Sequence, residues 1–418
     1  MLAGRIIFWD STLGMRIFPL TLRGFAATLL ILIGAAPLHA QTCNSTQSFE
    51  RWLDDFKREA AAAGISRGAI TSVLGSVAYD PAIVRKDRAQ GVFAQTFLQF
   101  SGRMVSGDRM KRGAENLDRY RDAFARIEKQ YGVPGPVIAG FWGLETDFGA
   151  NSGKSPIIGA LATLAYDCRR PELFREQLLA ALKIVEKGDL TPDQMIGAWA
   201  GELGQTQFLP AHYLEFGVDF DGDGRVDLRN SVPDVLASTA RLLQHHGWKR
   251  GEPWIQEVSV PGDLPWKEAD LSIQHPRAKW AGWGVRQRDG RPLQADNVPA
   301  SLLLPMGRHG PAFLAFANFK VYTEWNQSLV YATTAAYYAS RLAGAPAYNK
   351  GKPDIPAYGL QEMRSLQELL VRHGYDVGKL DGIIGAATRD AIRQAQIKFG
   401  LPADSYPSDE LFRRLRGS

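Results

Sequence analysis

The 418-residue sequence has few of the residues and patterns that mark the common metal-dependent and nucleophilic enzymes. It has only two cysteines, and its seven histidines form no zinc-binding cluster. It contains no metalloprotease helix, no glycine-rich phosphate loop and no nucleophilic serine elbow. These absences argue against zinc hydrolases, phosphate-loop nucleotide enzymes and serine hydrolases of the elbow type.

A hydrophobic run long enough to span a membrane is also missing from the N-terminal region. The apolar run Phe25 to Ala36 has 12 residues, follows Arg16 and Arg23, and leads to Ala40. This length is short for a membrane helix and is typical of the core of an export signal. We therefore predict that residues 1–40 are a signal peptide and that the mature protein is periplasmic, without a stable membrane span.

The scarcity of cysteine leaves two alternatives for the pair that is present. An oxidising compartment would allow Cys43 and Cys168 to form a disulfide, but two separate thiols fit the sequence equally well. A lipid anchor at Cys43 is disfavoured because Thr42 precedes it, where a lipoprotein signal normally has a small residue such as glycine or alanine.

Charge of either sign is not in large excess. The net charge of +5 falls to +3 once the signal segment is removed, since that segment carries three arginines and one aspartate. This balance favours acidic polymers only weakly, and we predict no nucleic-acid partner. With 45% hydrophobic and 22% charged residues, the chain is globular and long enough for two or more domains.

The sequence pattern predicts an α+β fold that is mainly α-helical. Helical periodicity runs from Phe49 to Arg126 and returns at Leu173 to Glu186 and at Val232 to His246. Short strand-like runs at Trp254 to Val260 and Phe313 to Tyr322 predict a small inserted sheet. Proline, glycine and lysine mark a linker at residues 345–357, which separates a large domain at 41–344 from a small helical module at 358–418.

Glu145 is the most informative single residue. It lies near the end of a predicted helix that starts at the prolines of residues 133–136, and Gly149 indicates where the helix ends. Four residues share one face at the spacing i, i+3, i+4 and i+7: Ile138, Phe141, Trp142 and Glu145. Burial and the negative end of a helix both favour a protonated carboxyl, which can act as a general acid.

The alternative for Glu145 is a buried glutamate that pairs with an arginine. Asp147 does not offer a second catalytic carboxylate, because two positions along a helix turn it roughly 200° away. No paired-carboxylate glycosidase pattern is therefore visible around this helix.

A second motif, residues 197–210, combines three glycines with Gln207. Glycines permit a close approach of the backbone, and an amide both donates and accepts hydrogen bonds, which suits a sugar ligand. A tight corner in which the amide caps a backbone group explains the pattern equally well.

A third motif is an acidic loop that resembles the calcium loop of an EF-hand. Oxygen ligands stand at loop positions 1, 3 and 5, a glycine at position 6 and a backbone carbonyl at position 7: Asp219, Asp221, Asp223, Gly224 and Arg225. Position 12 is Asn230 rather than glutamate, so we predict Asp234 as the remaining ligand. We expect a structural Ca²⁺ that braces the protein; an acidic turn without metal is the alternative.

A fourth segment, Asn318 to Tyr331, mixes aromatic rings with amides. Such side chains stack on sugar rings and bond their hydroxyl groups, although aromatics at this spacing are also common in protein cores. This segment alone does not distinguish a sugar-binding surface from a part of the protein core.

Taken together, these motifs resemble the membrane-bound lytic murein transglycosylase B family, followed by a three-helix peptidoglycan-binding-type domain. The resemblance rests on residues 143–146, 161–166, 205–210, 219–227 and 325–328. It implies a lysozyme-like cleft in which Glu145 is the sole catalytic acid and base. It further implies glycan contacts from Gln207, Asn326 and Tyr331, and a calcium site that includes Asp219, Asp221, Asp223 and Asp234.

The resemblance also implies a reaction. Glu145 would protonate the oxygen between N-acetylmuramic acid and N-acetylglucosamine, and the same group would then deprotonate the C6 hydroxyl to give a 1,6-anhydromuramoyl end. Peptidoglycan strands are the implied partner. Two departures stand out, since the family commonly has serine in place of Ala198 and an aromatic residue in place of Leu242. The alternatives are a hydrolytic muramidase and a catalytically silent wall-binding scaffold.

Overall fold

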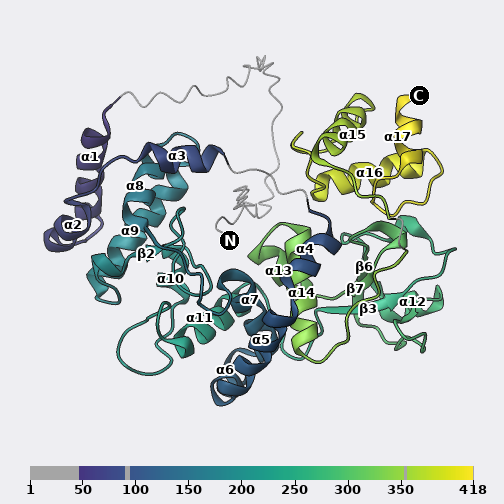
Figure 1. Cartoon of the computed structure of the whole chain (residues 1–418), viewed down its shortest axis with the longest axis horizontal. Coiled ribbons are helices and arrows are strands. Elements are labelled where there is room, and N and C mark those ends of the chain that lie inside the picture. Colours follow the sequence, from purple (N-terminus) through teal and green to yellow (C-terminus); the bar gives the residue numbers. More distant parts are fainter. Residues whose placement is uncertain (1–46, 90–94, 353–354, 418) are drawn as a thin grey trace, which may run out of the picture.

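The computed structural model describes residues 47–89, 95–352 and 355–417 (Figure 1). The predicted signal peptide and Cys43 lie outside these residues. Across the described ranges, no helix combines the length and the apolar character needed to cross a membrane.

Short capped helices build the N-terminal region, as the sequence predicts. Their bounds are α1 Phe49–Ala62, α2 Arg67–Leu74, α3 Pro81–Arg88, α4 Phe97–Met104, α5 Gly107–Arg119 and α6 Arg121–Tyr131. Serine, threonine or aspartate precedes each of the first five and accepts a hydrogen bond from a backbone N–H of the first turn. These side chains satisfy amide groups that have no partner within the helix, so the local sequence sets where each helix begins.

The helix α7, Gly135–Thr146, lies in the middle of the large domain (Figure 1). Other helices surround it or follow it: α8 Ile157–Tyr166, α9 Pro171–Lys187, α10 Pro210–Phe216, α11 Val232–His245, α13 Phe319–Trp325 and α14 Leu329–Leu342. Glycines allow close packing, since a Cβ on Gly140 would lie 3.4 Å from the Cβ of Ala339 on α14. The α7 helix is therefore a buried core helix and not the one-sided amphipathic helix that we expected.

A small antiparallel sheet is inserted between α11 and α13. Its strands are β3 Ile255–Ser259, β4 His275–Pro276, β5 Arg286–Gln287, β6 Pro299–Leu303 and β7 Ala312–Ala315, in the order β4-β6-β7-β3-β5. The sheet and α12, Arg277–Gly282, have their own apolar core around Trp280. The pair β1 Ser155–Pro156 and β2 Ile196–Gly197 forms a separate two-stranded ribbon.

The predicted strand Phe313 to Tyr322 is correct only in its first part. The strand β7 ends at Ala315, and α13 begins at Phe319. Aromatic and β-branched residues favour strands, but here Phe319 and Tyr322 are buried one helical turn apart against the core. Tertiary packing thus overrides the local strand preference.

The C-terminal module contains three helices, as predicted: α15 Leu360–Arg372, α16 Ala386–Lys398 and α17 Asp409–Arg416. It has a separate apolar core and lies next to the sheet region (Figure 1). Asp404 accepts from the backbone and the side chain of Arg308, and Arg389 donates to the carbonyl of Leu304 at 2.9 Å. The segment before the module is also held, since Asn349 N–H donates to Glu257.

Candidate active site

Glu145 lies where the buried helix α7 reaches the domain surface. Leu144 and Thr146 on either side of it are buried, whereas Glu145 is half-buried. Within α7 only Pro136 and Glu145 are not buried. The sequence pattern predicted that Glu145 lies on a buried face of the helix. In the structure, Glu145 is instead partly exposed near the C-terminal end of α7, between buried neighbours.

Two donors hold the carboxylate of Glu145. The indole Nε1 of Trp325 donates to Oε1 at 2.7 Å, and the hydroxyl of Tyr331 donates to the same oxygen at 2.6 Å. Such short hydrogen bonds to a carboxylate are stronger and more directional than bonds between neutral groups. The ring of Trp325 is in turn packed on Phe141, with ring centroids 4.4 Å apart. Glu145 is therefore oriented by side chains that are themselves fixed.

The turn between α13 and α14 positions both donors. Asn326 Oδ1 accepts from the backbone N–H of Ser328 at 2.9 Å, and Ser328 Oγ accepts from the N–H of Tyr331 at 3.3 Å. These bonds end one helix and start the next within three residues, so Trp325 and Tyr331 face the same carboxylate. Asn326 thus shapes the site through its side-chain oxygen, while its contact with glycan stays a prediction.

Gln207 is a loop-forming residue in this structure. It is 8% exposed, has a left-handed backbone with φ of +56°, and its Nε2 donates to the carbonyls of Gly204 at 2.9 Å and Ser152 at 3.3 Å. Of the two explanations that the sequence left open, the capping of backbone groups is present. The predicted contact of Gln207 with glycan is not tested by these bonds.

Gln205 connects the loop to α7, a role that the sequence did not reveal. Its Oε1 accepts from Trp142 Nε1 at 2.8 Å, and its Nε2 donates to the carbonyl of Arg229 at 2.8 Å. Its own carbonyl accepts from the hydroxyl of Thr146, the residue after Glu145. The only signal was its place in the motif 205–210. Gln205 therefore links α7 to Arg229, near the end of the acidic loop.

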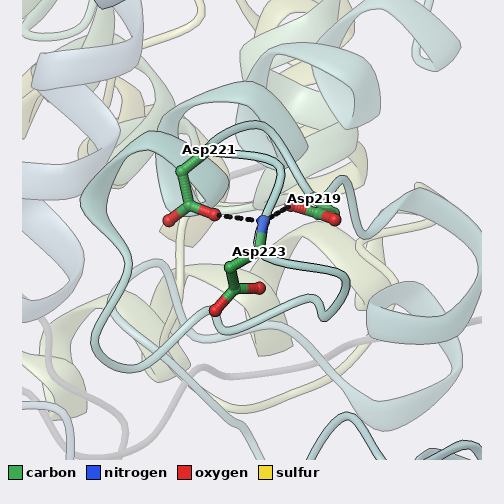
Figure 2. Close-up of side chains that lie close together, drawn as sticks. All are labelled: Asp219, Asp221 and Asp223. Carbon is green, nitrogen blue, oxygen red and sulfur yellow. Dashed lines mark hydrogen bonds between the residues drawn. The ribbon is translucent and has the colours of Figure 1, made fainter.

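The acidic loop lies between α10 and α11, and its first three aspartates converge (Figure 2). One carboxylate oxygen from each of Asp219, Asp221 and Asp223 lies within 4.8 Å of the others. Backbone N–H groups shape the loop, and Gly222 N–H and Gly224 N–H donate to Asp219 at 2.7 and 2.9 Å. Three carboxylates this close repel one another without a cation, and all-oxygen donors are those that Ca²⁺ prefers. The residues present fit a calcium ion.

Asp234 and Arg225 are placed differently from these three aspartates. Asp234 is fully buried and accepts backbone N–H bonds from Phe220 at 2.7 Å and Asp227 at 2.9 Å. Asp234 thus closes the base of the loop, and it is not one of the three grouped carboxylates. Arg225 N–H donates to Asp223 at 2.9 Å, which keeps Arg225 next to the cluster. Metal ligation by Asp234 and by the Arg225 carbonyl stays a prediction.

The two residues that depart from the resembled pattern are both buried. Ala198 is 4% exposed and Leu242 is 2% exposed, and Leu242 belongs to the main core. Leu242 on α11 is therefore a packing residue in this chain.

Cys168 is disulfide-bonded. The other cysteine of the sequence, Cys43, lies outside the described residues. The pairing of Cys168 with Cys43 in particular stays a prediction.

Comparison with known proteins matches each part of the chain to a known family. The family model described as "Transglycosylase SLT domain" matches residues 48–340, and the one described as "Putative peptidoglycan binding domain" matches residues 360–415. The sequence is 30% identical over 237 residues to the membrane-bound lytic murein transglycosylase B of Escherichia coli strain K12. That alignment covers 56% of this chain and 64% of the relative, so less than two thirds of the relative is spanned.

Solved structures extend the comparison to nearly the whole chain. SltB3 from Pseudomonas aeruginosa, in complex with NAG-anhNAM-pentapeptide, is 40% identical with a TM-score of 0.82 over 88% of this chain and 100% of that chain. The Escherichia coli lytic transglycosylase Slt35, in complex with calcium, is 27% identical with a TM-score of 0.60 over 70% of this chain and 92% of that chain. These neighbours have lysozyme-like folds, which confirms the predicted fold class.

Proposed function

Since this chain belongs to the transglycosylase SLT domain family, we propose that it is a lytic murein transglycosylase in which Glu145 is the single general acid and base. The observation that carries the proposal is the pair of hydrogen bonds from Trp325 and Tyr331 to one oxygen of Glu145. A carboxyl group that must act twice on one substrate needs a fixed position, and these donors supply it.

The first step is an acid-catalysed cleavage. Glu145 gives its proton to the oxygen that joins N-acetylmuramic acid to N-acetylglucosamine, and the bond from that oxygen to C1 breaks through an oxocarbenium-like state. The acetamido group of the muramoyl ring assists in place of a second carboxylate. Asp147, the nearest acidic residue in sequence, is already bound by Arg109 and Arg112.

The second step closes the ring of the product. Glu145, now ionised, removes the proton of the C6 hydroxyl, and O6 bonds to C1 to form the 1,6-anhydromuramoyl end. Glu145 recovers its proton, and no water is consumed. The contacts of Gln207, Asn326 and Tyr331 with the glycan hold the ring for this second step.

Calcium has a structural part in this proposal. The three aspartates of the acidic loop, with Asp234 and the carbonyl of Arg225, hold Ca²⁺, whose charge offsets their repulsion. Gln205 carries the effect toward the active site because it bonds both to Arg229, near the end of the loop, and to Trp142 on α7. The ion thereby stiffens the support of Glu145 and takes no part in the chemistry. A relative solved with calcium supports this assignment.

The proposed place of action is the periplasm, after removal of residues 1–40. A disulfide at Cys168 supports an oxidising compartment. The C-terminal module binds peptidoglycan, as its family description suggests, and brings the enzyme to its polymer.

The test is an analysis of the ends that the mature protein produces. Purified peptidoglycan sacculi are digested and the released muropeptides are identified by mass spectrometry. Anhydromuramoyl ends support the transglycosylase, whereas reducing ends would assign a hydrolase. Binding of sacculi without release of any fragment would assign the silent scaffold instead.

A further inference from the structure

The chain makes an unusual turn directly after Glu145. Asp147, Phe148 and Gly149 have φ angles of +59°, +61° and +86°, so three successive residues are left-handed. This conformation suits glycine but is disfavoured for aspartate and more so for phenylalanine. Backbone strain of this kind persists only where the surrounding contacts hold it, and it often accompanies functional sites.

Two arginines of α5 hold the first residue of this turn. Arg109 Nε lies 2.9 Å from Asp147 Oδ1, and Arg112 Nη2 lies 2.8 Å from the same oxygen. Arg112 also donates to the backbone carbonyl of Asp147 at 3.3 Å. Burial acts to raise the pKa of Asp147, but hydrogen bonds from Arg112 and Arg109 outweigh it and lower the pKa. The ion pairs therefore fix both the side chain and the backbone of this residue.

Phe148 fixes the same turn from the apolar side. Its ring would lie 2.7 Å from a Cβ on Gly143 of α7 and 3.4 Å from a Cβ on Gly113 of α5. The two glycines thus leave room for the ring between the helices, and larger residues there would displace it. Phe148 also packs edge-on against Trp142, with ring centroids 5.2 Å apart.

The same network reaches the hydroxyl group that orients Glu145. Tyr338 donates to the carbonyl of Arg109 at 2.9 Å, and Tyr331, seven residues earlier on α14, donates to Glu145. Residues seven apart lie on the same face of a helix. The helices α5 and α14 therefore contact each other, and both contact α7.

We propose that Asp147 is a positioning residue: its ion pairs with Arg109 and Arg112 hold the end of α7 so that Glu145 serves both steps of the reaction. The inference rests on the proposed function. Loss of these ion pairs should affect the second step most, because in that step the carboxylate must reach the C6 hydroxyl before water attacks C1. A displaced Glu145 can still cleave the bond, but water then competes with the C6 hydroxyl.

The test is the Asp147→Asn variant, which keeps a side chain that tolerates the left-handed backbone and removes the charge. Kinetics on soluble glycan strands should show kcat reduced roughly 10-fold with KM unchanged, since a displacement of 1 Å costs up to about 10²-fold. Mass spectrometry should show reducing ends beside the anhydromuramoyl ends. Arg112→Gln, which removes one of the two pairs, should shift both readouts in the same direction but less.

Asp108→Asn is the matched control. Asp108 pairs with the same Arg112 at 2.9 Å but is exposed at the start of α5, so its loss should change neither kcat nor the product ends. Wild-type kcat and product ends in Asp147→Asn would overturn the inference. So would a lower kcat with an unchanged ratio of ends, since that is the result of a smaller folded fraction. A wild-type enzyme that makes no anhydromuramoyl ends would overturn the proposed function instead.

Discussion

Glu145 and the aspartates of the acidic loop are both functional carboxylates, but they are positioned in opposite ways. The partners of Glu145 are Trp325 and Tyr331, which are 180 and 186 residues away in sequence. Asp219 instead accepts from backbone N–H groups only three to five residues further on. The loop is therefore a local structure that a short motif encodes, whereas the active site exists only once α7, α13 and α14 have packed together.

This difference predicts different sensitivities. The loop should respond to the presence of a cation, because its exposed carboxylates repel one another when no cation is bound. The Glu145 site should respond to single side chains of distant helices, because each supplies one directional bond. Substitutions in the two regions should therefore have separable effects on catalysis and on stability.

Among the changes that distinguish the Glu145 site from the acidic loop, Tyr331→Phe is expected to have the largest effect. Glu145 becomes ionised as it gives up its proton, so the variant loses a hydrogen bond that strengthens in the transition state, and kcat/KM should fall roughly 10- to 100-fold. The melting temperature should change little because the ring remains packed. The measurement is the rate of anhydromuramoyl end formation on soluble glycan strands, together with a thermal melt.

Tyr337→Phe serves as the control on the same helix. Tyr337 accepts from Arg341 and makes no described bond to Glu145, so its hydroxyl should be dispensable for the rate. Equal rates for wild type and Tyr331→Phe would show that the hydroxyl does not orient the catalytic group.

Removal of calcium is expected to act on stability. If the ion is present at about 100 times its Kd, it stabilises the fold by about 2.7 kcal/mol, and chelation should lower the melting temperature by roughly 5 °C. Asp221→Ala should melt at the lower temperature with or without chelator. Differential scanning calorimetry in calcium and in chelator provides the measurement.

Asp263→Ala is the control for this experiment, because Asp263 is exposed and lies outside the loop. It should keep the full response to chelator. Identical melting curves of the wild type in calcium and in chelator would argue against the metal site.

The smallest effect concerns the pH dependence of stability at Asp147. Its pKa is lowered in the folded protein, so the ion pairs stabilise the fold above the ordinary carboxyl pKa of about 4. This contribution is lost as the pH falls through the lowered value. The melting temperatures of wild type and Asp147→Asn should therefore differ at pH 7 and converge as the pH falls below the ordinary carboxyl pKa and through the lowered pKa of Asp147.

Convergence is the diagnostic result in this titration. A difference that stays constant as the pH falls from 7 through the ordinary carboxyl range and below it would mean that the charge of Asp147 does not contribute. Thermal melts of both proteins across this range give the answer without a substrate.

The local part of the structure could be predicted from the sequence. The start of α1 at Phe49 follows from the capping residue Ser48, and the acidic loop follows from a fixed ligand spacing. Glu145 could be singled out because a carboxylate near the end of an apolar helix is unusual. These features depend on residues within one or two turns of each other.

The tertiary part could not be predicted in the same way. Nothing in the local pattern says that Trp325 bonds to Glu145 or that Gln205 links α7 to Arg229 in the acidic loop. The helix α13 was expected as a strand because its aromatic residues favour strands, and only its packing against the core decides otherwise. The burial of α7 on all sides likewise depends on helices far away in the sequence.

The central claim is that one carboxyl group performs both proton transfers. The most direct test compares the mature protein with Glu145→Gln in the digestion of purified sacculi, with a thermal melt of each protein. The amide oxygen can still accept from Trp325 and Tyr331, so the variant should keep its melting temperature. We predict that only the wild type releases fragments with anhydromuramoyl ends; release of these ends by folded Glu145→Gln at the wild-type rate would contradict the account.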